Sequence, residues 1–356
     1  MTIPLKFRAF ALTAAVVTAA WSATACGSSE PTDSAGADSA ASSEASDTQV
    51  TSQEGQWPRT ITTLNGAGEE TEVTLEKAPT NIASTSVTLT GNLLALDAPV
   101  TSTGVQSKGN AIADDKGFFK QWAPEAEDAG LEVSYEGQPD VEAILAQNPD
   151  LVVMSSSGQD SATSVYDQLA DVVPVIVVDY SNKQWSEVLE ELGTAIGHEK
   201  QADEAIASYH DRISAVTKSI TAPAQPVNIV SLGQGGNTLN VWTKESAQGS
   251  LFHDLGWEIA VPDAQYGGGN PQFDGRSDVV SVAAENFGPA LTGKTIFALN
   301  ADGKDSPTEF LKTQEQLKDN PAISTDSVHD LQPYAFRIDY YSAMKVLDDV
   351  EALFKN

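Results

Sequence analysis

The residues that could carry chemistry do not form a known catalytic or metal-binding motif. Four histidines are present without close pairing and without an HExxH motif: His198, His210, His253 and His329. A structural zinc site needs thiolates, and the sequence has one cysteine. It also lacks a GxSxG nucleophile elbow and a Walker loop. We therefore expect a binding protein that is not an enzyme and has no cofactor.

Arginine is well suited to holding an anionic ligand, because it stays protonated, is weakly hydrated and can stack on a flat ring. Beyond residue 25 the sequence has four: Arg59, Arg212, Arg276 and Arg337. Arg59 lies in a predicted hairpin, where we expect a structural role. Arg212 follows Asp211 in a predicted helix, where we expect a surface ion pair.

Arg276 and Arg337 are the better candidates for ligand binding. Arg276 follows a glycine-rich loop, and Arg337 lies between a predicted strand and the closing helix. Both are loop positions of the kind that line a cleft. The alternative is that each pairs with a nearby acid, Asp278 or Asp339.

One long amphipathic helix over Glu199–Ser219 organises the predicted fold. Its apolar residues recur at steps of three or four: Ala202, Ile206, Tyr209, Ile213 and Val216. A helix of this length spans about 30 Å, at about 1.5 Å per residue. We interpret it as a strut that joins two lobes.

Short apolar runs alternate with helices on both sides of this helix, which predicts parallel sheets covered on both faces. In the first lobe we predict strands at Asn81–Ser84, Val100–Gly104, Leu151–Met154 and Val175–Val178, and helices at Thr88–Leu96, Asp140–Gln147 and Val165–Ala170. In the second we predict strands at Val227–Leu232 and Thr295–Leu299, and helices at Ser246–Leu255, Val279–Phe287, Glu309–Lys318 and Asp339–Phe354.

The predicted fold class is α/β, with two Rossmann-like lobes joined by a single long α-helix. The lobes span residues 57–183 and 223–356, and the linking helical segment spans 184–222. A hairpin around Asn65-Gly66 leads into the first lobe. Ligand sites in such folds lie in the cleft between lobes, beside the carboxyl ends of strands.

The first 56 residues are predicted to direct and tether the protein. Residues 1–25 have the basic, apolar and small-residue regions of a secretory signal peptide. Cys26 is placed like the lipidated cysteine of a bacterial lipoprotein, although Ala23 stands where that signal prefers leucine. Residues 26–56 are mostly small, polar or acidic, as in a disordered tether. We expect an extracytoplasmic protein anchored to the cell membrane through lipid on Cys26.

The charge of the chain is strongly acidic. The formal net charge is -30, and removal of Lys6 and Arg8 with the signal peptide would make it -32. Such a surface repels polyanions, so we expect no nucleic-acid partner. A bound anion would depend on a few cations gathered at its site, since charges beyond about 8 Å are largely screened at physiological salt.

Seven stretches of the sequence resemble the extracytoplasmic solute-binding proteins of iron-siderophore ABC importers, the class with a rigid helical backbone between two lobes. They are Ser84–Val100, Ala113–Trp122, Pro149–Val153, Asp160–Leu169, Val241–Gly249, Ala283–Asn286 and Phe336–Phe354. The resemblance runs from about Pro79 to the end of the chain. It implies a monomer that binds a ferric siderophore, a catecholate such as ferric enterobactin, and delivers it to a permease.

The resemblance also implies which residues contact the ligand in the second lobe. Arg276 and Arg337 would face the trianionic chelate, and Trp242 would cover one of its rings. The alternative for Trp242 is a core aromatic. Tyr340 is a weaker candidate, since it could instead pack the last helix.

In the first lobe the implied cations are Lys116 and Lys120, whose alternative is a solvated loop. An arginine expected just before this motif is replaced by Ala111. Two glutamates, Glu142 and Glu285, match the positions that dock on the permease. Both are predicted in the first turn of a helix, where the helix dipole also favours a carboxylate.

Other functions remain open on the sequence. A hydroxamate siderophore, haem or cobalamin could be the ligand. A neutral hydroxamate chelate would depend little on Arg276 and Arg337. A siderophore esterase would need a nucleophile with a base, and a bare cell-surface scaffold would bind no chelate.

Overall fold

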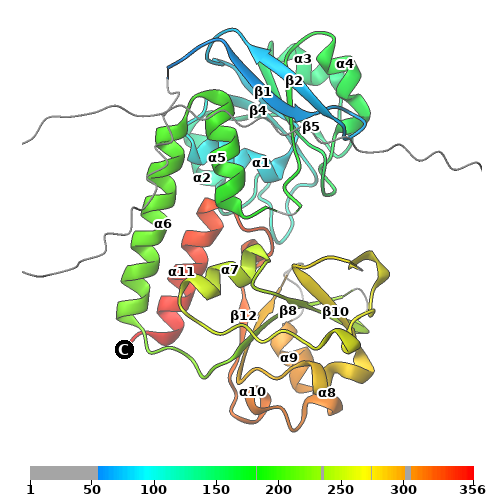
Figure 1. Cartoon of the computed structure of the whole chain (residues 1–356), viewed down its shortest axis with the longest axis vertical. Helices are drawn as coiled ribbons and strands as arrows, with labels where there is room; N and C mark the ends of the chain where they lie inside the picture. Colours follow the sequence, from blue (N-terminus) through cyan, green and yellow to red (C-terminus); the bar gives the residue numbers. More distant parts are fainter. Residues whose placement is uncertain (1–54, 182, 234–235, 274, 301–305) are drawn as a thin grey trace, which may run out of the picture. The chain divides into compact units, whose positions relative to one another are not determined.

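The computed structural model describes residues 55–181, 183–233, 236–273, 275–300 and 306–356. The predicted signal peptide, Cys26 and the predicted tether up to residue 54 lie outside these residues. The described part of the chain contains no helix that is long and apolar enough to cross a membrane. Its elements form two α/β lobes with a pair of long helices beside them (Figure 1).

The first lobe is built on a wholly parallel sheet, as predicted, but with five strands where four were predicted. Its order is β5 (Glu132–Glu136), β4 (Val100–Val105), β3 (Ile82–Ser84), β6 (Leu151–Ser155), β7 (Val175–Val178). Its helices are α1 (Val87–Ala95), α2 (Ala123–Asp128), α3 (Val141–Ala146) and α4 (Tyr166–Ala170). Strands β6 and β7 are buried at every residue, as expected when helices cover both faces.

The strand order of this sheet fixes where a ligand can bind. The chain runs outward from β3 through β4 to β5, and then returns to pair β6 against the other side of β3. The connections therefore diverge at the carboxyl ends of β3 and β6, which leaves a crevice there. The predicted hairpin, β1 (Arg59–Leu64) with β2 (Glu70–Leu75), packs on β7, where Thr63 Oγ1 donates to the Val177 carbonyl at 3.0 Å.

The second lobe has a mixed sheet, so the prediction of a parallel sheet is only partly right. The order is β10 (Val279–Ala283), β9 (Thr238–Trp242), β8 (Val227–Leu232), β11 (Thr295–Leu299), β12 (Val328–Leu331). Strands β8, β11 and β12 are parallel, whereas β9 and β10 are antiparallel to their neighbours. Its helices are α7 (Ala247–Asp254), α8 (Phe287–Ala290), α9 (Pro307–Lys312) and α10 (Pro321–Ser324).

The predicted helix over Val279–Phe287 is wrong. Its first five residues are the edge strand β10, followed by the 3-10 turn η5 (Ala284–Asn286) and then α8. Three valines in this stretch favour a strand, because their branched side chains pack well on a pleated sheet. The predicted helix over Glu309–Lys318 is also too long, since α9 ends at Lys312 and the 3-10 turn η6 (Glu315–Leu317) follows.

The long predicted helix is confirmed as α6 (Glu199–Ser219). It buries Ala202, Tyr209, Ile213 and Val216 as predicted, while Ile206 is only partly buried. The linking segment contains a second helix, α5 (Trp185–Ile196), which ends where Gly197 takes a φ of 82°. This left-handed conformation is one that glycine adopts without a steric cost.

The last helix, α11 (Tyr340–Phe354), packs along α6 (Figure 1). Arg212 of α6 joins them: it contacts Asp348 at 2.6 Å and Glu351 at 2.7 Å on α11, and not the adjacent Asp211. Arg59 has the structural role expected of it, since its guanidinium contacts Glu199 at the start of α6 at 2.6 Å.

The first turn of α11 also reaches into the first lobe. Asp339, the N-cap of α11, is buried and accepts a hydrogen bond from Gln121 Nε2 at 3.2 Å. A Cβ atom at Gly91 of α1 would lie 2.6 Å from the Asp339 carboxylate, so only glycine allows this approach. One hydrophobic cluster runs through both lobes, α6 and α11, and each lobe has a further cluster of its own.

Candidate functional site

A cleft of about 830 Å³ is lined by residues of both lobes. From the first lobe come Thr88, after β3, and Ser157 to Gln159, after β6. These are the two strand ends at which the crevice was expected. The start of α5 also lines the cleft, with Trp185 among its lining residues. The second lobe supplies the opposite wall: Asn240, Trp242, Gln248, Arg276, Phe336 and Arg337.

Arg337 crosses the cleft from the second lobe to the first. It is the residue that follows the 3-10 turn η7 (Pro333–Phe336), and its Nη1 donates to Thr88 Oγ1 at 2.5 Å. The same nitrogen lies 3.7 Å from Asp160 Oδ1. Its guanidinium also lies over the Phe119 ring, 5.7 Å from the centroid. The partner is thus Asp160 and not Asp339, the acid considered from the sequence.

Asp160 is a fully buried carboxylate behind Thr88 and Arg337. Ser86 Oγ donates to it at 2.6 Å, the Thr88 amide at 3.0 Å and the Tyr180 hydroxyl at 2.7 Å. Burial alone would raise the pKa of Asp160, but the Arg337 charge and these hydrogen bonds hold its pKa below the ordinary value. Burial and the charge of Asp160 raise the pKa of Tyr180, so that its hydroxyl stays a donor.

The low pKa of Asp160 makes stability depend on pH. Its ionised form is favoured in the folded state, so its contribution is complete above the unfolded pKa of about 3.9 and is lost as pH falls through the lower folded pKa. We expect urea unfolding to show a loss of stability below about pH 4 that is smaller in Asp160→Asn. An equally steep loss in that variant would contradict this assignment.

Arg276 lies on the cleft wall but is already paired. Its Nε and Nη2 contact the Asp278 carboxylate at 2.8 and 2.5 Å, and the pKa of Arg276 is raised mainly by that bond. Arg276 therefore lines the cleft and also forms the ion pair considered from the sequence. Its guanidinium lies 5.5 Å from the centre of the Phe273 ring, and the side chain is 37 % exposed. An anion in the cleft would share this arginine with Asp278.

Trp242 ends β9 and is both a core residue and a lining residue. Its indole Nε1 donates to Ser231 Oγ at 3.2 Å, and its ring meets Phe336 edge to face with centroids 6.3 Å apart. It is 8 % exposed. Trp242 and Phe336 thus form an aromatic pair on the second-lobe wall of the cleft, of which Phe336 was not predicted.

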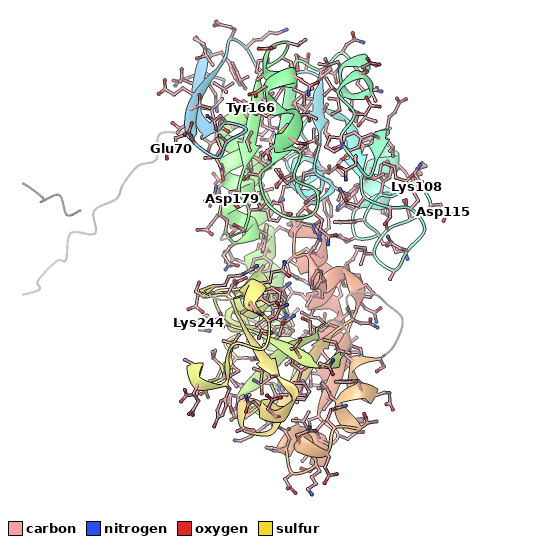
Figure 2. All side chains as sticks on the ribbon, turned by 90° about the vertical axis from the view of Figure 1, so that its right-hand side faces the viewer. Glu70, Lys108, Asp115, Tyr166, Asp179 and Lys244 are labelled. Carbon is pink, nitrogen blue, oxygen red and sulfur yellow. The ribbon has the colours of Figure 1, made fainter. Side chains whose placement is uncertain are left out.

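The structure does not bring the other three predicted contacts into the cleft lining, although all three are described residues. Lys116 is exposed and pairs with Glu127 at 3.0 Å, and Lys120 Nζ donates to the carbonyls of Asn110 and Ala111 at 2.9 and 3.1 Å. In the same loop, Figure 2 shows Lys108 and Asp115 at the outer edge of the lobe.

Tyr340 packs behind the cleft. Its ring lies 6.0 Å from that of Trp185, and its hydroxyl contacts Ser208 Oγ of α6 at 3.4 Å. Tyr340 therefore makes the contacts expected under the alternative considered from the sequence, in which it packs the last helix.

The predicted docking glutamates are both exposed, one on each lobe. Glu142 lies in the first turn of α3, after the N-cap Asp140. Glu285 lies in the short turn η5, and so belongs to a 3-10 turn rather than to an α-helix. Both side chains are available to a partner.

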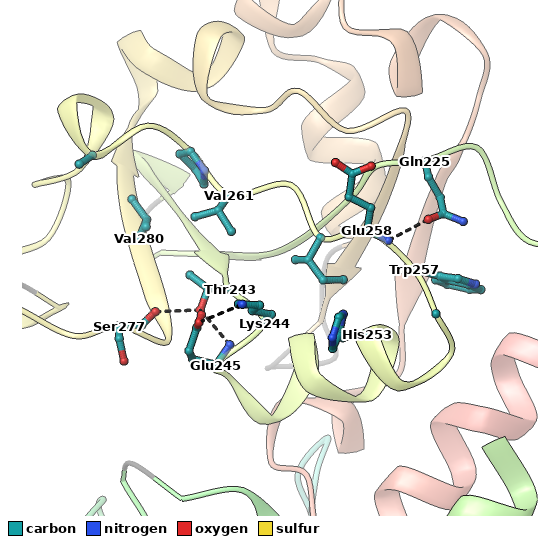
Figure 3. Close-up of a pocket in the computed structure, with 14 residues that line it drawn as sticks. Gln225, Thr243, Lys244, Glu245, His253, Trp257, Glu258, Val261, Ser277 and Val280 are labelled. Carbon is teal, nitrogen blue, oxygen red and sulfur yellow. Dashed lines mark hydrogen bonds and ion pairs between the residues drawn. The ribbon is translucent and has the colours of Figure 1, made fainter. Parts of the chain in front are cut away.

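A second cavity, also about 830 Å³, belongs to the second lobe alone (Figure 3). Several of its polar groups bond to each other: Thr243 Oγ1 donates to Glu245 Oε2 at 2.8 Å, and Gln225 Oε1 accepts from the Glu258 amide at 2.8 Å. Its lining contains none of the predicted ligand residues, all of which are described. We place the ligand site in the cleft between the lobes.

Asp160 and Gln248 were not predicted from the sequence, and both bond to residues that line the cleft. Asp160 begins one of the stretches that carry the family resemblance, but its sequence gives no sign that it is buried. Gln248 is buried and donates to the carbonyls of Ala335 and Phe336 at 3.2 and 2.7 Å, which fixes the backbone that carries Arg337.

In the described residues, no group of three or more His, Cys, Asp or Glu could hold a metal ion.

The chain is similar to known binding proteins over most of its length. The ferric enterobactin-binding periplasmic protein FepB of Escherichia coli O6:H1 is 40 % identical over 302 residues, which are 85 % of this chain and 92 % of FepB. The Fe(3+) dicitrate-binding periplasmic protein FecB of Escherichia coli K12 is 25 % identical over 56 % of this chain and 63 % of FecB. The structure of holo-ViuP superposes with a TM-score of 0.73 and 30 % identity, covering 85 % of this chain and 96 % of ViuP.

A more distant structure, the FhuD protein of S. pseudintermedius, has the same fold with a TM-score of 0.62 at 19 % identity, and covers 83 % of this chain and 97 % of that one. The model of the periplasmic binding protein family matches residues 82–335. This match spans both lobes and the helix between them, and the chain therefore belongs to the periplasmic binding protein family.

Proposed function

We propose that the protein is the extracytoplasmic receptor of an ABC importer and that it binds a ferric catecholate siderophore, such as ferric enterobactin, in the cleft. The observation that carries this is the wall on which Arg276 and Arg337 lie beside Trp242 and Phe336. The 40 % identity to FepB, which is named for ferric enterobactin binding, supports the same ligand class.

The chemistry of this wall suits such a ligand. A ferric tris-catecholate is a trianion with aromatic rims, so its site needs permanent cations and flat side chains. Arg337 can offer its remaining N–H groups, since Thr88 takes only one of the five. The rings of Trp242 and Phe336 can cover the catechol rims. A volume of about 830 Å³ lies within the range of about 300–1,000 Å³ usual for small-molecule sites.

Release to a permease would follow without chemical change to the ligand. The lobes share one hydrophobic cluster and the two helices α6 and α11, so opening should be a small rigid-body adjustment. Glu142 and Glu285 would dock on the permease, and lipid on Cys26 would hold the receptor at the membrane. We expect the receptor to act as a monomer.

Titration of the purified protein with ferric enterobactin, followed by tryptophan emission, tests the ligand. Two tryptophans line the cleft, Trp185 and Trp242, so binding should change emission saturably at micromolar ligand. A neutral ferric hydroxamate is the control, because it lacks the charge that the arginines recognise. The absence of a saturable change with the catecholate would overturn the proposal, and equal affinity for both chelates would favour a receptor of another ligand class.

A further inference from the structure

Arg337 is held from behind by a buried anion. Its Nη1 donates to Thr88 Oγ1 at 2.5 Å, the Thr88 amide donates to Asp160 Oδ2 at 3.0 Å, and Asp160 Oδ1 lies 3.7 Å from the same Nη1. Asp160 and Thr88 belong to the first lobe, whereas Arg337 belongs to the second. Arg337 is 24 % exposed, and Asp160 is not exposed. A ligand in the cleft therefore meets the arginine first, and the carboxylate lies behind it.

The Asp160 carboxylate makes no short bond to the Arg337 guanidinium, so the guanidinium can still bind an anionic ligand. Asp160 already accepts hydrogen bonds from Ser86, Thr88 and Tyr180, so its charge is stabilised without a direct bond to Arg337. At 3.7 Å the pair lies beyond the range of a charge-assisted hydrogen bond, which is about 2.7–2.9 Å. This contrasts with Arg276, which makes two short bonds to Asp278.

We propose that Asp160 is a positioning residue for ligand capture, which draws the Arg337 guanidinium onto the wall of the first lobe and leaves its other N–H groups directed to an anionic chelate. This inference rests on the proposed function. A positioned arginine loses little side-chain freedom when the ligand binds, and lower ordering cost means higher affinity. Asp160 thus increases affinity for an anion although it carries the same sign of charge.

Asp160→Asn removes the charge with little change of shape. Its amide oxygen can keep the bond from the Thr88 amide, and its NH₂ group can donate to the Tyr180 hydroxyl, which can accept. We expect affinity for ferric enterobactin to fall about tenfold or more, the factor that corresponds to 1.4 kcal/mol. Thr88→Val, which removes only the hydroxyl that Arg337 contacts, should reduce affinity in the same direction.

A double-mutant cycle separates positioning from a general structural role. If Asp160 acts through Arg337, then Asp160→Asn should not weaken binding further in an Arg337→Ala protein, since the two residues form one unit. The matched control is Asp254→Asn, which also replaces a carboxylate that accepts a hydrogen bond from a tyrosine hydroxyl, that of Tyr209 at 2.8 Å, but lies outside the cleft. It should bind as the wild type does.

Three outcomes would overturn the inference while leaving the proposed function intact. Asp160→Asn could weaken binding equally with and without Arg337, it could bind more tightly than the wild type, or it could fold and bind unchanged. If Asp160→Asn fails to fold, unchanged affinity in Thr88→Val would overturn it. A wild-type protein that does not bind ferric enterobactin would instead contradict the proposed function.

Discussion

Replacing Arg276 and Arg337 together by alanine should weaken binding of ferric enterobactin roughly 100-fold to 10,000-fold. Each hydrogen bond to a charged group contributes about 1.5–3 kcal/mol, and 1.4 kcal/mol is a factor of ten. Of the two, Arg337 should matter more, because Arg276 is already bonded to Asp278 through two nitrogens. The measurement is the dissociation constant from tryptophan emission of the two single variants and the double variant.

The matched control for these variants is Arg212→Ala. Arg212 is likewise an ion-paired arginine, bonded to Asp348 and Glu351, but it joins α6 to α11 outside the cleft, so its loss should leave affinity unchanged. The salt dependence of binding is a second readout, since screening weakens the wild type more than the double variant. A double variant with wild-type affinity for the catecholate would show that these arginines do not hold the ligand.

Reversing the charge of Glu142 and Glu285 together to arginine should abolish uptake into cells while the soluble protein keeps its affinity. Both side chains are exposed, and neither lines the cleft. The family resemblance implies that these glutamates meet arginines of the permease, so arginines in their place would face like charges. Like charges placed opposite each other at a docking surface cost several kcal/mol, which is enough to prevent association. The measurement compares uptake of iron-labelled chelate in cells with binding by the purified variant.

A matched pair of exposed acids controls for the change of net charge. Glu70 of β2 and Glu309 of α9 also lie one on each lobe, and Glu309 lies in the first turn of its helix as Glu142 does. Their reversal to arginine should leave uptake at the wild-type level. If the Glu142 and Glu285 variant supports normal uptake, the docking assignment is wrong.

The sequence was most informative where local pattern and tertiary structure agree. The period of apolar residues in α6 and the short apolar strands of the first lobe depend on burial of one face or two, and burial leaves a clear pattern. The run from Val279 was misread because a short apolar stretch fits a strand or a helix equally well. This run forms a strand because it pairs with β9, and a pairing between strands cannot be seen in the sequence.

The same limit applies to the site. Arg276, Arg337 and Trp242 belong to residue types that are rare in this sequence, and the structure places all three in the cleft lining; their contact with a ligand stays a prediction. Lys116 could not be placed, since its long side chain bonds to Glu127 instead of turning toward the cleft. The role of Asp160 could not be predicted because it depends on contacts with Ser86 and Arg337, which are 74 and 177 positions away in the sequence.

The docking of α11 on the first lobe has a consequence for the order of folding. Asp339, at the start of α11, is packed against Gly91 and bonded to Gln121, so the first lobe completes its interior with residues from near the end of the chain. During synthesis or export the first lobe emerges long before them. We expect its α1 face to stay uncovered until the last helix arrives, so that both lobes reach the native state in one concerted step.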